Sequence, residues 1–460
     1  MNGDFLRPPI MLSLDDVAIA TGGALQGSRV AISGVTTDSR RISAGDLFVA
    51  LTGERFDGHE FVAEAVRRGA AAALVSRRVQ GDLPIPQVVV DDTRLALGRL
   101  AASWRARFAM PLVALTGSNG KTTVKEMIAA ILAAHCGSRD PVLATEGNLN
   151  NDIGMPLTLL RLRDTHRYAV IEMGMNHEGE IGYLTRIARP DVALVNNAHR
   201  AHVGLLGDVA AVARAKGEIY AGLADSGIAL VNVDDAFAGY WKGLNTDRRV
   251  VTFGLAPSAD VHASVEGTQA RFVTPVDAFA LTLQVAGEHN LLNAVAACAA
   301  AHALEIPPHA IQAGLAGFAG VPGRLQRREG AQGVTVIDDT YNANPESMKA
   351  AIAVLARAPG RRVFAMGDMG ELGEDAPAMH AEVGTYARTM GIDRLLAVGP
   401  DSAHAVKAFG AEGRHFPTVE ALLEEAARER APATILVKGS RFMRMERVAD
   451  ALARGGADAA

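Results

Sequence analysis

The sequence predicts an α/β protein of three domains: a small α/β N-terminal domain, a central parallel-sheet domain and a C-terminal open α/β domain. Short apolar segments alternate with helical segments along most of the chain, as strands and helices do in α/β folds. The alternation restarts near residue 110 and again after Pro322-Gly323. A chain of 460 residues suits roughly three domains of about 150 residues each. We expect these domains at residues 1–109, 110–322 and 323–460.

The first domain combines short strands with a helix. Residues 46–51 and 87–90 form apolar runs that predict strands, and residues 59–68 have helical spacing. Pro84 and Pro86 mark a loop before the second strand. This mixture predicts a small α/β domain.

The central domain begins with an apolar strand at 112–115, a Gly-rich turn and a helix near 121–135. Buried strands separated by helices predict a parallel, doubly wound sheet, because parallel strands need crossover connections. Further strands are expected at 168–173, 192–196 and 228–232, and helices near 178–188 and 209–223.

The C-terminal domain repeats this alternation, which predicts a Rossmann-like open sheet. Strands are expected at 334–337, 362–366, 394–398 and 434–437, and helices near 346–357, 379–390, 419–430 and 441–454. No short-period repeat and no long low-complexity segment interrupts the pattern.

The composition excludes several classes of protein. Lys and Arg number 46 against 51 Asp and Glu, and the formal net charge of −5 argues against a general nucleic-acid binder. Two cysteines are too few for a disulfide framework. No apolar run reaches the roughly 18–20 residues of a membrane span, and the first five residues lack the features of a signal peptide. We therefore expect a cytoplasmic protein without a membrane span.

The strongest local signal is Thr-Gly-Ser-Asn-Gly-Lys-Thr-Thr at residues 116–123, between an apolar strand and an amphipathic helix. Glycines let backbone N–H groups curl around an anion, and the start of the helix adds partial positive charge. A lysine here reaches the β- and γ-phosphates of a nucleotide, and a hydroxyl holds Mg²⁺. The predicted phosphate-binding residues are Gly117, Ser118, Asn119, Gly120, Lys121, Thr122 and Thr123, with Thr122 also at the metal.

The loop departs from the generic phosphate-loop pattern, which requires a glycine five residues before Gly120 where this chain has Leu115. The alternative is a Gly-rich turn formed by chance. We favour the phosphate site because the strand, the loop, the Lys-Thr pair and the helix occur together. This shorter form of the phosphate loop, without the first glycine, indicates a particular branch of ATP-using enzymes.

Three residues further along the chain are candidates for the same site. Glu172 lies at the carboxyl end of a predicted parallel strand, which faces the ligand crevice, and there a carboxylate can hold Mg²⁺. His202 follows the next strand, and by itself it would indicate only a polar loop. Lys216, on a helix, would by itself indicate a solvated surface residue.

The phosphate loop resembles that of the Mur ligases, ATP-dependent amide-bond-forming enzymes of three domains whose wider superfamily includes folylpolyglutamate synthetases. The resemblance spans the whole chain. Residues 37–40, 45–51 and 53–59 resemble the family's N-terminal nucleotide-sugar domain. Segments 147–160 and 172–181 resemble the member that joins D-alanyl-D-alanine to UDP-N-acetylmuramoyl-tripeptide. The segments most specific to that member are 338–345, 367–373 and 438–441.

The resemblance implies a catalytic role for four residues. Lys121 would bind the β- and γ-phosphates of ATP. Glu172 and His202 would join Thr122 as Mg²⁺ ligands. Lys216 resembles the lysine that these ligases carry as a carbamate, an anion able to hold a second Mg²⁺, which reverses its interpretation as a surface residue.

The resemblance also implies contacts to the substrates. Asn290 and Asn293 would lie on the adenine side of ATP, Arg324 would reach its phosphates from the domain hinge, and Asp339 would contact the ribose. Asn148, Asn150 and Asn151 would face the UDP-sugar-peptide, with Ser39 and Arg40 on the uridine side. Further substrate-binding residues are expected in the loop that contains Tyr341, Asn342 and Asn344.

The chain departs from the family pattern at two places. Residues 198–200, Ala-His-Arg, replace the usual small residues before the family histidine, and Gly204 stands where an acid is common. These changes predict different electrostatics in this loop.

The implied reaction converts a carboxylate to an acyl phosphate with ATP, after which the amine of D-alanyl-D-alanine displaces phosphate. The resemblance also suggests a monomer, and it leaves lysine and diaminopimelate open as the third peptide residue. One alternative is another ligase of the superfamily, against which segments 338–345 and 367–373 argue. Others are a phosphate-loop kinase or nucleotide switch, disfavoured by Leu115 and the third α/β domain, and a binding-only pseudoenzyme, disfavoured by the complete set of catalytic candidates.

Overall fold

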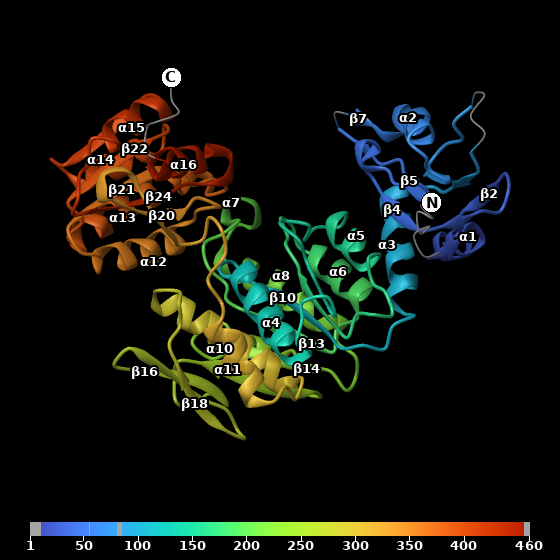
Figure 1. Ribbon diagram of the computed structural model, residues 1–460, viewed down its shortest axis with the longest axis horizontal. Helices are drawn as coiled ribbons and strands as arrows, with labels where there is room; N and C mark the ends of the chain where they lie inside the picture. Colours follow the sequence, from blue (N-terminus) through green and yellow to red (C-terminus); the bar gives the residue numbers. More distant parts are fainter. Residues whose placement is uncertain (1–10, 55, 81–84, 455–460) are drawn as a thin grey trace, which may run out of the picture.

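The computed structural model describes residues 11–54, 56–80 and 85–454, so the expectation about the first five residues lies outside its range. The described chain folds around three main sheets, one in each third of the sequence. In Figure 1 the central domain (green to yellow) lies below, with the N-terminal domain (blue) and the C-terminal domain (orange to red) above it on opposite sides. The predicted three-part α/β architecture is confirmed.

The N-terminal domain contains a five-stranded sheet in the order β2-β9-β8-β5-β4. Its strands are β2 (Ala24–Gln26), β4 (Gly34–Thr36), β5 (Asp46–Val49), β8 (Ala72–Val75) and β9 (Gln87–Val89), and its α-helices are α1 (Leu14–Thr21), α2 (Val62–Arg67) and α3 (Thr93–Arg105). Two small antiparallel pairs join β1 (Leu12–Ser13) to β3 (Ala31–Ile32) and β6 (Thr52–Gly53) to β7 (Phe56–Asp57).

Helix α3 connects this domain to the central one. The indole Nε1 of Trp104 donates to the carbonyl oxygen of Leu162 at 3.2 Å, and Nε of Arg105 donates to that of Ala188 at 3.1 Å. Both side chains are buried, so α3 packs on the central domain as well as on its own sheet.

The central domain has a nine-stranded sheet in the order β11-β12-β10-β13-β14-β15-β16-β17-β18. The pairs from β11 to β16 are parallel, as expected, whereas β16-β17 and β17-β18 are antiparallel. The strands are β10 (Leu112–Thr116), β11 (Val142–Ala144), β12 (Tyr168–Glu172), β13 (Val192–Val195), β14 (Ile228–Asn232), β15 (Arg249–Gly254), β16 (Val261–Glu266), β17 (Gln269–Val273) and β18 (Ala278–Leu281). The α-helices are α4 (Lys121–Cys136), α5 (Gly154–Leu159), α6 (Glu180–Ala188), α7 (Val203–Leu206), α8 (Val209–Gly217), α9 (Ala238–Gly243), α10 (Glu288–Ala303) and α11 (Pro308–Ala316).

The C-terminal domain has a six-stranded sheet in the order β19-β20-β24-β21-β22-β23, parallel except for the edge strand β19. The strands are β19 (Gln326–Glu329), β20 (Thr335–Asp339), β21 (Arg361–Gly367), β22 (Arg394–Val398), β23 (Gly413–Phe416) and β24 (Ala433–Lys438). The α-helices are α12 (Pro345–Ala356), α13 (Ala376–Thr389), α14 (Ser402–Phe409), α15 (Val419–Ala426) and α16 (Glu446–Arg454). The helix expected at 441–454 is divided, because a 3₁₀ turn at Arg441–Met443 ends at Arg444 with a positive φ of 52°.

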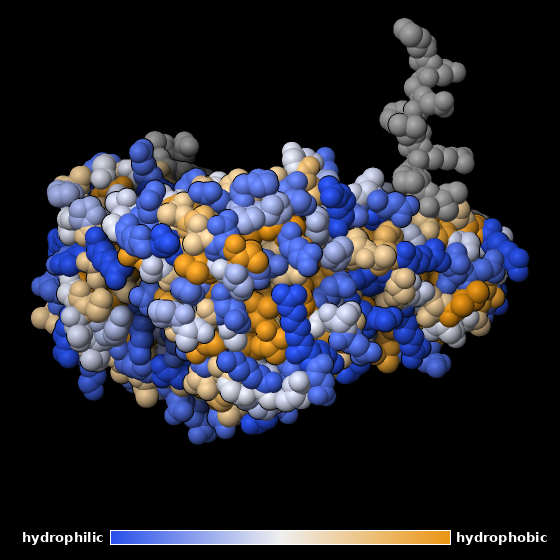
Figure 2. Space-filling model, turned by 90° about the horizontal axis from the view of Figure 1, so that it is seen from below, coloured by the Kyte–Doolittle hydropathy of each residue, from blue (hydrophilic) through white to orange (hydrophobic). Residues whose placement is uncertain are grey.

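Among the described residues, no helix is both long and apolar enough to cross a bilayer. On the face seen in Figure 2, hydrophobic side chains occur in small groups between hydrophilic ones.

Helix α4, which follows the phosphate loop, is held by a close approach of α11. A Cβ atom on Gly314 would lie 2.4 Å from Cα of Ile131. We expect Gly314→Ala to lower the free energy of unfolding by about 1–3 kcal/mol, the usual cost of overpacking, as measured by urea denaturation. Gly239→Ala in α9 is the matched control: a Cβ there meets nothing within 4 Å, so the variant should be as stable as the parent or more so. Equal stability of both variants would contradict this account of α11.

Candidate active site

The candidate site lies where the carboxyl ends of three neighbouring strands meet. After β10 the chain continues to β11 on one side of it, and after β12 it crosses to β13 on the other side. Such a reversal of strand order is the usual position of a ligand crevice in an open α/β fold. A cavity of about 1480 Å³ opens there between the central and C-terminal domains. Its lining also includes Arg94 and Leu95 on α3 and Phe442 of the C-terminal domain.

The phosphate loop is shaped by two asparagines at the end of β13. The Asn119 backbone N–H donates to Oδ1 of Asn197 at 2.8 Å, and its carbonyl oxygen accepts from the amides of Asn196 and Asn197 at 3.0 and 3.1 Å. Gly120 has a φ of 79°, and a Cβ there would lie 2.3 Å from Oδ1 of Asn293. The loop is therefore preformed around the start of α4.

Lys121 turns back over its own loop. Its Nζ donates to the carbonyl oxygen of Gly117 at 2.8 Å and more weakly to that of Ser118 at 3.5 Å. Burial lowers the pKa of the Lys121 ammonium, while the nearby Glu172 carboxylate opposes that shift. The charge is thus held at the loop by neutral carbonyl groups, which an anionic phosphate can replace.

Glu172 ends β12 and is almost fully buried, with 2% of its surface exposed. Its Oε2 accepts from Oγ1 of Thr122 at 2.9 Å, and its Oε1 accepts from Nδ2 of Asn150 at 2.7 Å. Its backbone N–H donates to Oγ1 of Thr145 at 3.0 Å. Nη2 of Arg324 donates to the same Thr122 hydroxyl at 2.9 Å, which links the start of the C-terminal domain to the loop.

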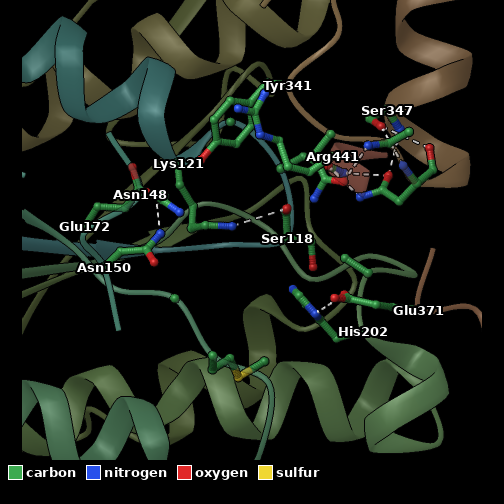
Figure 3. A pocket seen from close by; sticks show the side chains of 18 of the residues that line it. Ser118, Lys121, Asn148, Asn150, Glu172, His202, Tyr341, Ser347, Glu371 and Arg441 are labelled. Carbon is green, nitrogen blue, oxygen red and sulfur yellow. Dashed lines mark hydrogen bonds and ion pairs between the residues drawn. The ribbon is translucent and has the colours of Figure 1, made fainter. Parts of the chain in front are cut away.

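His202 and Lys216 lie in the same cavity. His202 has a φ of 63°, and its Nδ1 lies 2.6 Å from Oε2 of Glu371 in the C-terminal domain. Lys216 is only 1% exposed, and burial together with the charge of Lys121 places its pKa well below the usual value. Within the described part of the chain, Nζ of Lys216 has neither a carboxylate within ion-pair range nor a hydrogen-bond partner. Figure 3 shows Lys121, Asn150 and Glu172 on one side of the cavity and the His202–Glu371 contact on another.

The C-terminal domain contributes a second group of polar side chains. Oδ2 of Asp339 lies 2.6 Å from Nζ of Lys438, and its Oδ1 accepts from the Leu325 N–H. The guanidinium of Arg324 stacks 4.1 Å from the ring centre of Tyr341. Its Nε is buried without a hydrogen-bond partner among the described residues, so an anion in the cavity would satisfy it.

The cavity brings most of the predicted site residues together. Gly117 and Thr122 do not line the cavity, although Thr122 bonds to the lining residue Glu172. Ser39 and Arg40 lie in the N-terminal domain and do not line it either. The predicted residues that line it are Ser118, Asn119, Gly120, Lys121, Thr123, Asn148, Asn150, Asn151, Glu172, His202, Lys216, Asn290, Asn293, Arg324, Asp339, Tyr341, Asn342 and Asn344.

Several residues of the site were not predicted. Asn196 and Asn197 shape the phosphate loop, and their position at the end of a buried strand was the signal available in the sequence. Lys438 and Glu371 lie within segments noted for their resemblance, but nothing local indicates their partners Asp339 and His202. The Asp339–Lys438 contact depends on the pairing of β20 with β24, and the His202–Glu371 contact depends on how the central and C-terminal domains meet.

Comparisons with protein-family models match all three domains. The Mur ligase middle domain matches residues 115–301. The Mur ligase glutamate ligase domain matches residues 323–441, and the Mur ligase family catalytic domain matches residues 31–105.

Individual relatives match almost the whole chain. A protein of Escherichia coli K12 named UDP-N-acetylmuramoyl-tripeptide--D-alanyl-D-alanine ligase is 45% identical over 97% of this chain and 99% of its own length. A crystal structure of MurF from Acinetobacter baumannii is 39% identical and covers 96% of this chain and 98% of its own, with a TM-score of 0.89. A MurF ligase structure from Thermotoga maritima in complex with ADP is 29% identical, with a TM-score of 0.80 over 92% of this chain and 97% of its own.

Proposed function

The chain belongs to the Mur ligase family, and from this premise we propose that it joins D-alanyl-D-alanine to UDP-N-acetylmuramoyl-tripeptide with ATP. It is an ATP-dependent peptide ligase, and the products are the UDP-N-acetylmuramoyl-pentapeptide precursor of peptidoglycan, ADP and phosphate. The observation that carries the assignment is full-length similarity combined with a preformed phosphate loop, Lys121 and Glu172 in one cavity between two domains.

The chemistry requires two anions to approach each other. The tripeptide carboxylate must attack the γ-phosphate of ATP to form an acyl phosphate, because a carboxylate alone has no good leaving group. Lys121 and the N-terminus of α4 offset the negative charge at the phosphates, and Arg324 adds a further cation from the hinge. The amine of the dipeptide then attacks the acyl carbon, and phosphate leaves.

The residues at Glu172 fit a magnesium ion. Thr122 and Glu172 supply a hydroxyl and a carboxylate already in contact, the hard oxygen donors that Mg²⁺ binds together with water and substrate phosphates. His202 and Lys216 fit a second ion only when Lys216 carries a carbamate, and its burial, lowered pKa and lack of an acidic partner among the described residues favour that modification. Magnesium would neutralise phosphate charge there.

Replacing Glu172 with glutamine should lower kcat by at least about a hundredfold. The amide keeps the size of the side chain and one acceptor for the Thr122 hydroxyl, but it removes the negative charge. The measurement is ligation rate against Mg²⁺ concentration, and the apparent Mg²⁺ requirement should rise. Glu146→Gln, at an exposed position near β11, is the control and should behave like the parent. An unchanged Mg²⁺ requirement for Glu172→Gln would remove this residue from the metal site.

The domain boundaries, oligomeric state and location of the protein are also proposed. We place its domains at residues 1–109, 110–322 and 323–460, and we propose a cytoplasmic monomer.

Ser39 and Arg40 would contact the uridine end of the substrate when the N-terminal domain approaches the cavity, while Asn148, Asn150 and Asn151 would contact its sugar-peptide part. Asn290, Asn293 and Asp339 would hold the nucleoside of ATP, and Tyr341, Asn342 and Asn344 would complete the substrate site.

The deciding experiment measures phosphate release from ATP with UDP-N-acetylmuramoyl-tripeptide and Mg²⁺, with and without D-alanyl-D-alanine, together with the product mass. Release that needs both substrates and yields the pentapeptide supports the function. The lysine and diaminopimelate forms of the tripeptide are compared side by side, which determines the third residue. Absence of turnover with both forms would contradict the assignment.

A further inference from the structure

The segment that follows β13, residues 196–204, contacts both the phosphate loop and the C-terminal domain; we call it the bridging segment. Toward the loop, the His199 N–H donates to Oγ of Ser118 at 2.9 Å, and that hydroxyl lies 3.2 Å from the His199 carbonyl oxygen. Asn197 holds the backbone of Asn119. One side of the bridging segment is therefore part of the nucleotide site.

The other side of the bridging segment contacts the C-terminal domain through Arg200. Its Nη1 and Nη2 donate to the two carboxylate oxygens of Glu382 on α13 at 2.7 and 2.9 Å, a bidentate pair. Its Nε donates to Oε1 of Glu346 on α12 at 2.6 Å. Lys349 also contacts Glu382, and the two cations lower the pKa of that carboxyl to about 2.

The same helix α12 reaches the phosphate loop. Asn344, its N-cap, donates from Nδ2 to Oδ1 of Asn119 at 2.8 Å, and Asn119 returns a weaker bond at 3.3 Å. Glu346 lies two residues further along α12, so Arg200 and Asn119 hold the first turn of one helix from two directions. The position of the C-terminal domain is thereby tied to the loop that binds phosphate.

Gly204 shows how close the two domains are at the end of the bridging segment. Its N–H donates to the carbonyl oxygen of Glu371 at 3.0 Å, and a Cβ there would lie 2.6 Å from the backbone nitrogen of Gly373. The two departures from the family pattern, at residues 198–200 and at Gly204, thus both occur at this domain contact. Any side chain at residue 204 would push the domains apart.

We propose that Arg200 is a positioning residue: its ion pairs with Glu346 and Glu382 hold the C-terminal domain over the phosphate loop, so that the dipeptide amine reaches the acyl phosphate before water does. The inference rests on the proposed ligase function. A partly exposed ion pair adds little to the stability of a fold, whereas an equilibrium between two domain arrangements responds to small energy differences. Closure of this kind excludes water from a reactive intermediate.

The test is the ratio of phosphate released to pentapeptide formed. In Arg200→Ala this ratio should rise at least about twofold and KM for D-alanyl-D-alanine at least about fivefold, because a small misplacement of a reacting group is costly. KM for ATP should change by less than about twofold, since Asn197 and His199 still hold the loop. Glu382→Gln should reproduce the effect, and Arg200→Ala/Glu382→Gln should be no worse than Arg200→Ala alone.

Arg362→Ala is the matched control. Its side chain has the same 28% exposure as Arg200 and also forms a bidentate pair, with Asp393, but entirely within the C-terminal domain. This variant should keep the parental ratio and both KM values. Small-angle X-ray scattering of the substrate-free chains should show a larger radius of gyration for Arg200→Ala than for the parent or Arg362→Ala.

The positioning role would be overturned if Arg200→Ala kept the parental ratio of phosphate to pentapeptide and the parental KM for D-alanyl-D-alanine, even if its scattering changed. A parent chain without dipeptide-dependent turnover would overturn the ligase function instead. In that case scattering alone would test whether Arg200 holds the domains together. Equal radii of gyration for the parent and Arg200→Ala would overturn that role as well.

Discussion

Lys121→Ala should reduce dipeptide-dependent phosphate release by at least about a thousandfold. Among the described residues, the Lys121 ammonium donates hydrogen bonds only to carbonyl oxygens of its own loop, and ATP would provide a negatively charged partner. Because negative charge develops on the oxygen that leaves with ADP as the γ-phosphoryl group is transferred, an interaction with Lys121 would be strongest in the transition state, and most of the loss should fall on kcat.

The fold should survive this change. The loop backbone is held by Asn196 and Asn197, and neither bonds to the Lys121 side chain. Circular dichroism and the urea midpoint should therefore match the parent. Lys242→Ala, at an exposed position on α9, is the control and should retain full activity. A Lys121→Ala enzyme of parental activity would contradict the assignment of the phosphate site.

Lys216→Ala should cost at least about a hundredfold in kcat, and the parent enzyme should depend on dissolved carbon dioxide. Burial lowers the pKa of the Lys216 amine, so its neutral form is available to react, and the carbamate product is an anion in a cavity with Lys121. Removing carbon dioxide should lower parental activity, and adding bicarbonate should restore it. Labelling with ¹³C-bicarbonate should give a carbamate NMR signal that Lys216→Ala lacks.

The pH dependence of stability, measured without carbon dioxide, should also show whether the Lys216 amine is neutral in the folded chain. Its pKa is lower in the folded chain than in the unfolded one, where lysine has a pKa of about 10.4. The unfolded chain binds more protons between these two values, so stability rises with pH across that window and falls as pH decreases. Urea unfolding should show that the free energy of unfolding rises more between pH 7 and pH 9 for the parent than for Lys216→Met. An equal gain would mean that Lys216 is not held neutral.

The phosphate loop could be found from the sequence because its information is local. A strand, a Gly-rich turn and a helix follow one another within residues 112–136, and each element forms where it was expected. Glu172 could be placed for a related reason, since strand ends at one edge of a parallel sheet meet in one crevice.

Other residues depended on the resemblance or were missed. His202 and Lys216 have no local signal, and only the resemblance to the Mur ligases gave them a function. The antiparallel strands β16 to β18 and the helix α11 were not predicted, although α11 packs closely against α4.

The amino-acid sequence by itself determined the α/β class, the central strands and the loop that binds phosphate, because these follow from hydrophobic periodicity and from residues close together in the chain. Only the tertiary structure decided that Asn119 meets Asn344, that Arg200 meets Glu346 and Glu382, and that His202 meets Glu371. These partners are more than a hundred residues apart, and their side chains are polar, so no periodic pattern records their pairing. They meet because the C-terminal domain packs against the central domain at the carboxyl ends of the central strands.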